Sequence, residues 1–177
     1  MKLLEKHELT LLGSPILPEA IKTVLNAKVE SLKLMTERLT TVGAHEALFL
    51  LRNCFSIPKL TYFLRTAPCF MERSIMHKYD NYIKDSLQKI LNIHLEEPAW
   101  NQSTLPVNLG GLGIKMASEV SLPAYLSSVS ASMSTVKAMI PVSINDHQDS
   151  FYRLGSTEWM IKLNRNTLPE NPLFQEE

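Results

Sequence analysis

This 177-residue chain lacks the patterns that mark secreted and membrane proteins. It has only two cysteines, Cys54 and Cys69, and no C-x-x-C pair, so we expect neither a disulfide framework nor a zinc ribbon. We predict that both cysteines are reduced and buried as small hydrophobes. No apolar run approaches the roughly eighteen residues that a membrane span needs, and the first residues are too charged for a signal peptide. The expected location is therefore intracellular, in the cytoplasm or the nucleus, with no membrane partner.

An excess of charge of one sign is also lacking. The 18 Lys and Arg residues balance the 18 Asp and Glu residues, so the formal net charge is zero. The chain as a whole therefore creates no field that would draw it to nucleic acid, although a local cluster can still do so. A hydrophobic fraction of 45% is enough to bury a core.

No complete catalytic or metal-binding set occurs in the sequence. His45-Glu46 begins like a zinc-protease motif, but Phe49 stands where the second histidine is required. Glycines 110, 111 and 113 are followed by Lys115-Met116, without the Ser or Thr that completes a phosphate-binding Walker loop. We therefore predict no catalytic residue, no metal, no cofactor and no enzyme activity of the chain's own.

The hydrophobic pattern predicts a mainly α fold, an antiparallel helical bundle with a short N-terminal strand and a small glycine-rich hairpin or loop. Residues 8–12 are predicted as the strand, which Gly13-Ser14-Pro15 should end. From Pro18 to Val42, apolar residues recur along one helical seam that only Lys28 interrupts, which favours a long packed helix over a coiled coil. The seam residues are Ile21, Leu25, Leu32, Met35, Leu39 and Val42.

Further helices are expected along the rest of the chain. Residues 44–55 are apolar nearly all round, which predicts a central helix. The patterns at 58–66, 71–91 and 117–139 also predict helices. The residues expected on the buried face of the 71–91 helix are Ile75, Tyr79, Ile83, Leu87 and Ile90.

Glycines mark the expected turns, and a few aromatic or aliphatic residues mark the end of the chain. Two short apolar runs between Leu105 and Ile114 flank a glycine turn, which is typical of a small hairpin or a tight loop. The predicted turn residues are Gly13, Gly110, Gly111 and Gly113. The candidate anchors in the otherwise polar C-terminal part are Phe151, Tyr152, Trp159 and Ile161.

Local charge is biased in one stretch. Between Arg52 and Lys89 there are seven Lys and Arg residues against three acids, and aromatic residues stand among them. A basic surface with aromatic side chains can follow a nucleic-acid backbone and stack on bases; the alternative is a solvated helical face over core aromatics. The candidate nucleic-acid-binding residues are Arg52, Lys59, Arg65, Arg73 and Lys78.

Five short motifs follow one another in a recognisable order. They are LLGSPI at 11–16, HEALFLLR at 45–52, PKLTYFLRT at 58–66, WNQSTLP at 100–106 and GGLGI at 110–114. In this order, over residues 8–130, the chain resembles the region downstream of the palm in the reverse transcriptases of non-LTR, LINE-like retroelements.

The resemblance implies a role for each part of the chain. Residues 1–16 would be a primer-grip-like strand and turn, 17–92 a thumb-like helical bundle, and 93–140 a connection with its glycine-rich turn and helix, which leaves 141–177 as a polar C-terminal tail. In that family the thumb lies along the template–primer duplex, with Lys and Arg near the phosphates. The residues that match these cations are Arg52, Lys59 and Arg65.

The chain also departs from the pattern of this family. The paired aspartates that hold the catalytic metals are missing, because no Asp-Asp occurs anywhere in the chain. The resemblance therefore implies a non-catalytic fragment of a retrotransposon-type reverse transcriptase that binds an RNA–DNA or DNA duplex. The alternative is a structural or protein-interaction helical module, which would contact a protein partner or a second copy through exposed apolar helix faces.

Overall fold

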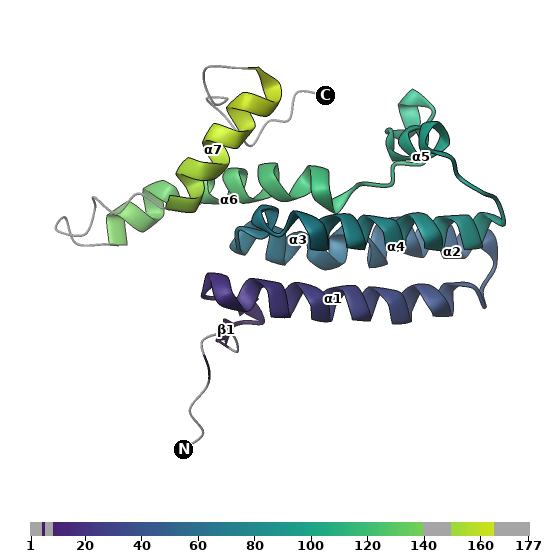
Figure 1. The fold of residues 1–177 in the computed structure, drawn as a ribbon, viewed down its shortest axis with the longest axis horizontal. Helices are drawn as coiled ribbons and strands as arrows, with labels where there is room; N and C mark the ends of the chain where they lie inside the picture. The colour runs from purple at the N-terminus through teal and green to yellow at the C-terminus, as the bar shows by residue number, and fades with distance from the viewer. Residues whose placement is uncertain (1–4, 6–8, 140–149, 165–177) are drawn as a thin grey trace.

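Helices form most of the part of the chain that the computed structural model describes, which is residue 5 and residues 9–139 and 150–164 (Figure 1). A two-stranded hairpin precedes them, and short 3-10 turns connect some of them. The elements are β1 (Thr10–Leu11), β2 (Ser14–Pro15), α1 (Pro18–Leu39), α2 (Ala44–Leu50), the π-helical η2 (Leu51–Phe55), α3 (Ile57–Thr66), η3 (Cys69–Met71), α4 (Arg73–Leu91), α5 (Glu97–Thr104), η4 (Val107–Leu109), α6 (Ala117–Met139) and α7 (Ser150–Leu163).

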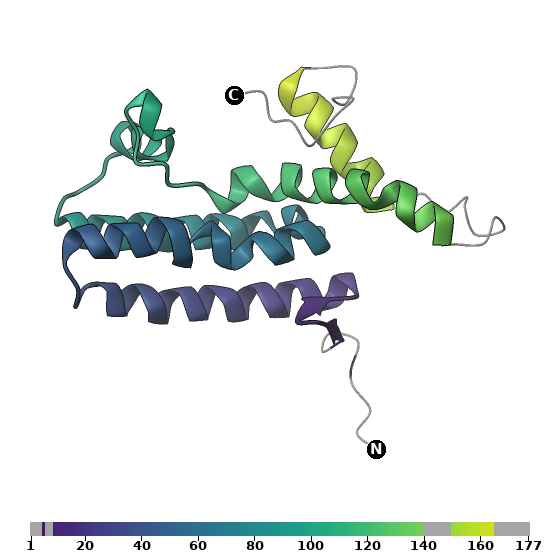
Figure 2. The ribbon, with the colours of Figure 1, turned by 180° about the vertical axis from the view of Figure 1, so that it is seen from behind.

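The long helices are stacked in layers. α1 packs on α4, α6 packs on α3 and α4, and α7 crosses over α6. α1 and α4 run in one direction, whereas α2, α3 and α6 run in the other (Figures 1 and 2). The prediction of a mainly α bundle with a short N-terminal strand is confirmed.

The N-terminal strand is part of a very short hairpin. β1 lies within the predicted residues 8–12, but Ser14 and Pro15 do not simply end it, because they form the antiparallel return strand β2. Leu12 and Gly13 make the turn with φ angles of 51° and 81°. Two successive residues with positive φ match the right-handed twist of a two-residue hairpin turn. The Ser14 hydroxyl lies 2.7 Å from the Thr66 hydroxyl and joins the hairpin to α3.

The buried stripe of α1 differs from the predicted seam at three positions. Val29 and Thr36 are buried where the seam passed through Lys28 and Met35, and Val42 lies beyond the helix with 45% of its surface exposed. Spacings that alternate strictly between three and four residues have a period of 3.5, whereas a straight α-helix has 3.6 residues per turn. The face that is buried therefore moves by one residue relative to the predicted seam at the first two of these positions. The other four seam residues are buried as predicted: Ile21, Leu25, Leu32 and Leu39.

Residues 44–55 are helical as predicted, as α2 and η2, but the prediction that this helix is central is wrong. Only Ala47 and Leu51 of this segment are buried, and the Phe49 side chain is 63% exposed. Cys54 is also exposed, which corrects its predicted burial, whereas Cys69 is buried as expected. An apolar composition makes a helix suited to burial on every side. Whether it is buried depends on how many neighbouring elements pack against it, which the composition does not show.

The main core lies between α1, α3 and α4 and continues into α6. All five residues predicted for the buried face of α4 are buried, and Ile114 and Ala117 at the start of α6 belong to the same cluster. Tyr79 of α4 extends this core to η2, where its hydroxyl donates hydrogen bonds to the carbonyls of Phe55 and Ser56, at 3.3 and 2.9 Å.

A second, smaller cluster holds α7. Its buried members are Phe70, Leu122, Tyr125 and Leu126, against which Phe151, Tyr152 and Trp159 pack. These three anchors contact the bundle, whereas the fourth candidate, Ile161, is 76% exposed. Within the predicted polar tail at 141–177, residues 150–163 thus form a docked helix; residues 141–149 and 165–177 lie outside the described part.

The glycine-rich segment is a loop and not a hairpin. After η4, the backbone N–H of Leu112 donates to Ser103 and that of Gly113 to Leu105, so the loop closes on the C-terminal end of α5. The positive φ of Gly110, 80°, lets the chain leave η4 in this direction. A Cβ on Gly111 would collide with the carbonyl oxygen of Leu105. The segment therefore needs glycine at these positions to fold back closely.

Candidate nucleic-acid interface

α3 presents an exposed basic face. Its apolar residues at 57, 60, 63 and 64 point into the bundle, since they recur at three- and four-residue spacing. The opposite side carries Lys59, Tyr62 and Arg65, all exposed, and the Tyr62 ring packs edge-on against Phe63 at 5.4 Å. The same spacing that builds the core thus places two cations and an aromatic ring together in solvent.

Acidic residues are missing from this stretch of the sequence. No Asp or Glu stands between Glu46 and Glu72 in the sequence, a stretch that includes η2 and the whole of α3. Among the described residues, Arg52, Lys59 and Arg65 form no ion pair. No acidic side chain in the described part of the chain therefore neutralises their charges.

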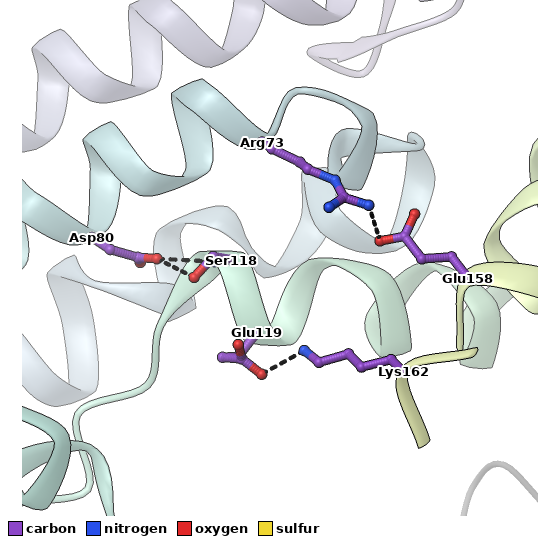
Figure 3. Close-up of polar contacts among 6 residues, drawn as sticks. All are labelled: Arg73, Asp80, Ser118, Glu119, Glu158 and Lys162. Atoms are coloured by element: carbon purple, nitrogen blue, oxygen red, sulfur yellow. Dashed lines mark hydrogen bonds and ion pairs between the residues drawn. The ribbon is translucent and has the colours of Figure 1, made fainter. Parts of the chain in front are cut away.

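The other two predicted binding residues lie elsewhere and face acids. Arg73 at the start of α4 forms a 2.7 Å ion pair with Glu158 of α7 (Figure 3). Lys78 lies 4.0 Å from Glu30 of α1. The five predicted residues thus do not make one surface: three lie on or beside α3 without an ion pair to any residue that the structure describes, and two connect α4 to its neighbours.

The structure adds one cation that the sequence analysis missed. Lys115 follows the glycine-rich loop and lines, together with Arg52, a shallow cavity of about 300 Å³ at the start of α3. Because Lys115 is far from the basic stretch in sequence, only the folding of the loop onto η2 brings the two together. The sequence does place Lys115 directly after the glycine cluster, but this arrangement indicates only a phosphate-binding Walker loop, whose pattern the sequence does not complete.

Gly113 is the predicted turn residue that touches this interface. It has a φ of 68°, and a Cβ there would lie 3.0 Å from the Cζ of Arg52 and 3.1 Å from its Nε. The Arg52 guanidinium therefore lies directly against the glycine backbone. The other three, Gly13, Gly110 and Gly111, lie in the hairpin turn and in the α5 loop, away from Arg52.

The perturbed ionisable groups lie inside the bundle and not on this face. Burial raises the pKa of Asp80, while hydrogen bonds from Ser118 and Ala117 and the nearby His77 act in the opposite direction. Burial also raises the pKa of Tyr79 above its ordinary range and that of Cys69 to about 12. These groups are placed to hold helices together, since none of them lies in an open cleft.

Metal and membrane sites were sought in the same part of the chain. Over residues 5, 9–139 and 150–164, no three His, Cys, Asp or Glu side chains come together as metal ligands would. No helix among those described is both long and apolar enough to cross a bilayer.

Comparison of the chain with protein-family models, with curated proteins and with solved structures finds no match. The likeness to the post-palm region of a reverse transcriptase consequently stays a prediction based on the order of its motifs.

A second shallow cavity lies on α2 and includes an exposed aromatic side chain. Around α2, the side chains of His45, Glu46, Phe49 and Leu50 line a shallow cavity of about 470 Å³. Phe49 is the largest exposed apolar group on this helix. Such exposed apolar side chains favour contact with another macromolecule over contact with water.

Proposed function

We propose that this chain binds the backbone of nucleic acid through the exposed face of α3 and has no catalytic activity of its own. The observation that carries the proposal is the set of exposed cations Arg52, Lys59 and Arg65, which form no ion pair among the described residues and stand in a stretch of sequence without acids. The resemblance to a reverse-transcriptase thumb points in the same direction and suggests an RNA–DNA or DNA duplex as the ligand. The action would take place inside the cell, in the cytoplasm or the nucleus, where such ligands occur.

The physical basis is the release of counterions. Each Lys or Arg that neutralises a phosphate sets free condensed cations, which makes binding favourable at low salt and weaker as salt increases. The exposed ring of Tyr62 lies between the cations and offers a surface for an unpaired base. Because nothing on α3 is arranged to read base edges, the binding should depend little on sequence.

The test is a salt series with a charge-neutralising variant. Binding of labelled RNA–DNA and DNA duplexes would be measured for the wild type and for the triple variant Arg52→Gln, Lys59→Gln, Arg65→Gln. We expect the negative slope of log K against log salt to become shallower by about 0.9 for each phosphate contact that is lost.

The matched control removes two cations that already have acidic partners. The double variant Arg73→Gln, Lys78→Gln should retain most of the affinity, because Glu158 and Glu30 already lie against these side chains. Absence of binding at low salt, or equal losses in both variants, contradicts the proposal. Template-directed, metal-dependent extension of a primer by the chain alone would contradict its non-catalytic part.

The second candidate function is a protein-interaction module, which the exposure of Phe49 favours. A partner protein or a second copy of the chain would cover the apolar surface of α2. Sedimentation over a range of concentrations would detect self-association. Phe49→Ser should abolish it, and the variant should stay folded because the Phe49 side chain is already exposed to solvent. A monomer at every concentration, with no bound partner protein, counts against this candidate.

A further inference from the structure

The cavity at the start of α3 has a lining from two distant parts of the chain. Arg52, Ser56 and Pro58 come from the junction of η2 with α3, whereas Gly113 and Lys115 come from the loop after α5. Its volume of about 300 Å³ can hold a small polyatomic ion with part of an attached group.

The charge of the lining is of one sign. Arg52 and Lys115 are its only ionisable residues, both are exposed, and neither forms an ion pair among the described residues. No acidic side chain lines the cavity. Two cations that converge on one hollow without a counter-ion favour an anionic ligand.

The neutral polar groups of the lining already have partners. The Ser56 hydroxyl donates to the carbonyl of Arg52 at 3.1 Å, and the Thr61 hydroxyl donates to that of Ile57 at 2.9 Å. The Asn53 amide donates to the carbonyl of Phe49 at 3.0 Å. The two hydroxyl protons are thus used within the protein, and the charged donors of the lining that remain without a partner among the described residues are those of Arg52 and Lys115.

The position of Arg52 depends on Gly113. A Cβ at 113 would lie 3.0 and 3.1 Å from the Cζ and Nε of the guanidinium, so the Arg52 side chain would have to shift, and the φ of 68° also disfavours a side chain there. A planar guanidinium can donate two parallel hydrogen bonds to an oxyanion, while an ammonium adds a compact charge from another side.

We infer that this cavity binds a single phosphate group, held by Arg52 and Lys115. The inference rests on the proposed function, because that phosphate would belong to the nucleic acid that follows α3, and the cavity would anchor it at the N-terminal end of the helix. The glycine-rich loop is then part of the binding surface and not only a connection. The binding step breaks no covalent bond.

The test uses inorganic phosphate as the probe, with sodium chloride at the same ionic strength as the reference. The amide signals of Gly113 and Lys115 and the Nε signal of Arg52 would be followed by NMR. We expect a saturable shift with phosphate that chloride does not reproduce. Lys115→Gln and Gly113→Ala should each weaken this binding by about tenfold, the loss of roughly one strong charge-assisted hydrogen bond.

Lys59→Gln is the matched control, because Lys59 is an exposed α3 lysine that does not line the cavity. It should weaken duplex binding and leave the phosphate shift unchanged. Circular dichroism of each variant would show that the helices are intact, and Arg52→Lys provides a variant that keeps the charge but loses the planar fork.

The two proposals fail in different ways. Phosphate binding without duplex binding would overturn the proposed function and support the phosphate site in the cavity. Duplex binding that depends on Lys59 and Arg65, with equal responses to phosphate and chloride, would overturn the cavity alone. A phosphate shift that survives in Lys115→Gln and in Gly113→Ala would also overturn it.

Discussion

The carboxylate of Asp80 in α4 closes the N-terminal end of α6 by accepting two hydrogen bonds from Ser118. One comes from the backbone N–H at 3.0 Å and one from the hydroxyl at 2.6 Å (Figure 3). The backbone N–H of Ala117 donates a third. The first turn of a helix leaves such N–H groups without partners, so a residue of one helix here caps another across the bundle.

The burial of this carboxyl makes stability depend on pH with a defined sign. Because burial raises the pKa of Asp80 in the folded protein, the folded state holds the proton more tightly than the unfolded state does. The contribution of this group is therefore complete below the unfolded pKa of about 4 and decreases as pH rises through the raised folded pKa. We expect the stability advantage of the wild type over Asp80→Asn, measured by urea unfolding, to decrease from acid to neutral pH.

Removal of the carboxyl altogether should be more costly. Asp80→Ala leaves buried N–H groups of α6 unpaired, which should reduce the free energy of unfolding by about 1–3 kcal/mol. Ser118→Ala is the control, since it removes one hydroxyl donor and leaves the two backbone bonds in place. An advantage over Asp80→Asn that grows with pH, or an Asp80→Ala variant as stable as the wild type, would contradict the assigned cap.

Tyr79 offers a second test of how the helices are joined. Burial keeps its pKa above the ordinary range, so its hydroxyl stays protonated and donates to two carbonyls where η2 ends. Tyr79→Phe should therefore destabilise the protein by about 1–2 kcal/mol, as expected for a lost buried hydrogen bond. The measurement is equilibrium urea unfolding. Tyr62→Phe, on the exposed side of α3, should change stability by less than about 0.5 kcal/mol.

The two cysteines should differ strongly in reactivity. Burial raises the pKa of Cys69 to about 12, and its Sγ donates to the carbonyl of Phe63 at 3.4 Å, so very little thiolate forms at neutral pH. Cys54 is exposed. A thiol reagent should modify Cys54 rapidly in the folded protein and Cys69 only after unfolding. In Cys54→Ser the fast phase should vanish; a fast phase that remains would show Cys69 to be accessible.

α7 should be released by a bulky residue at position 155. A Cβ on Gly155 would already lie 3.1 to 3.3 Å from Leu122, Leu126 and Phe70, so Gly155→Leu cannot fit without separating α7 from α6. We expect a loss of about 1–3 kcal/mol and faster amide hydrogen exchange in residues 150–163. Ile161→Ser changes an exposed side chain of the same helix and should leave the exchange unchanged.

Much of the helical framework could be predicted from the sequence, because local signals define it. Pro18 and Gly43 delimit α1 and its turn. The apolar spacing of α4 predicts five of its buried residues correctly, although Met76, Asp80 and Ser86 are buried as well. The errors concern contacts between elements. Apolar residues at 44–55 predicted a central helix, but the chain supplies too few neighbours to surround it, and Phe49 and Cys54 remain in solvent.

In the candidate interface, too, local features could be predicted from the sequence and contacts between distant residues could not. The exposed position of Lys59 and Arg65 follows from helical spacing alone. In contrast, Arg73 pairs with Glu158 and Lys78 lies near Glu30, and no local pattern links residues so far apart along the chain. Lys115 was missed for the same reason, since its neighbour Arg52 belongs to another part of the sequence.

The loop after α5 has a consequence for how this protein can vary among related sequences. Exposed loops usually tolerate insertions and deletions. Here the N–H groups of Gly111, Leu112 and Gly113 donate to the carbonyls of Pro106, Ser103 and Leu105, so each residue occupies a fixed place in a closed turn. An added residue would break this pairing and move Lys115 away from Arg52. We therefore expect homologous chains to keep the length of this segment constant even where its exposed side chains change.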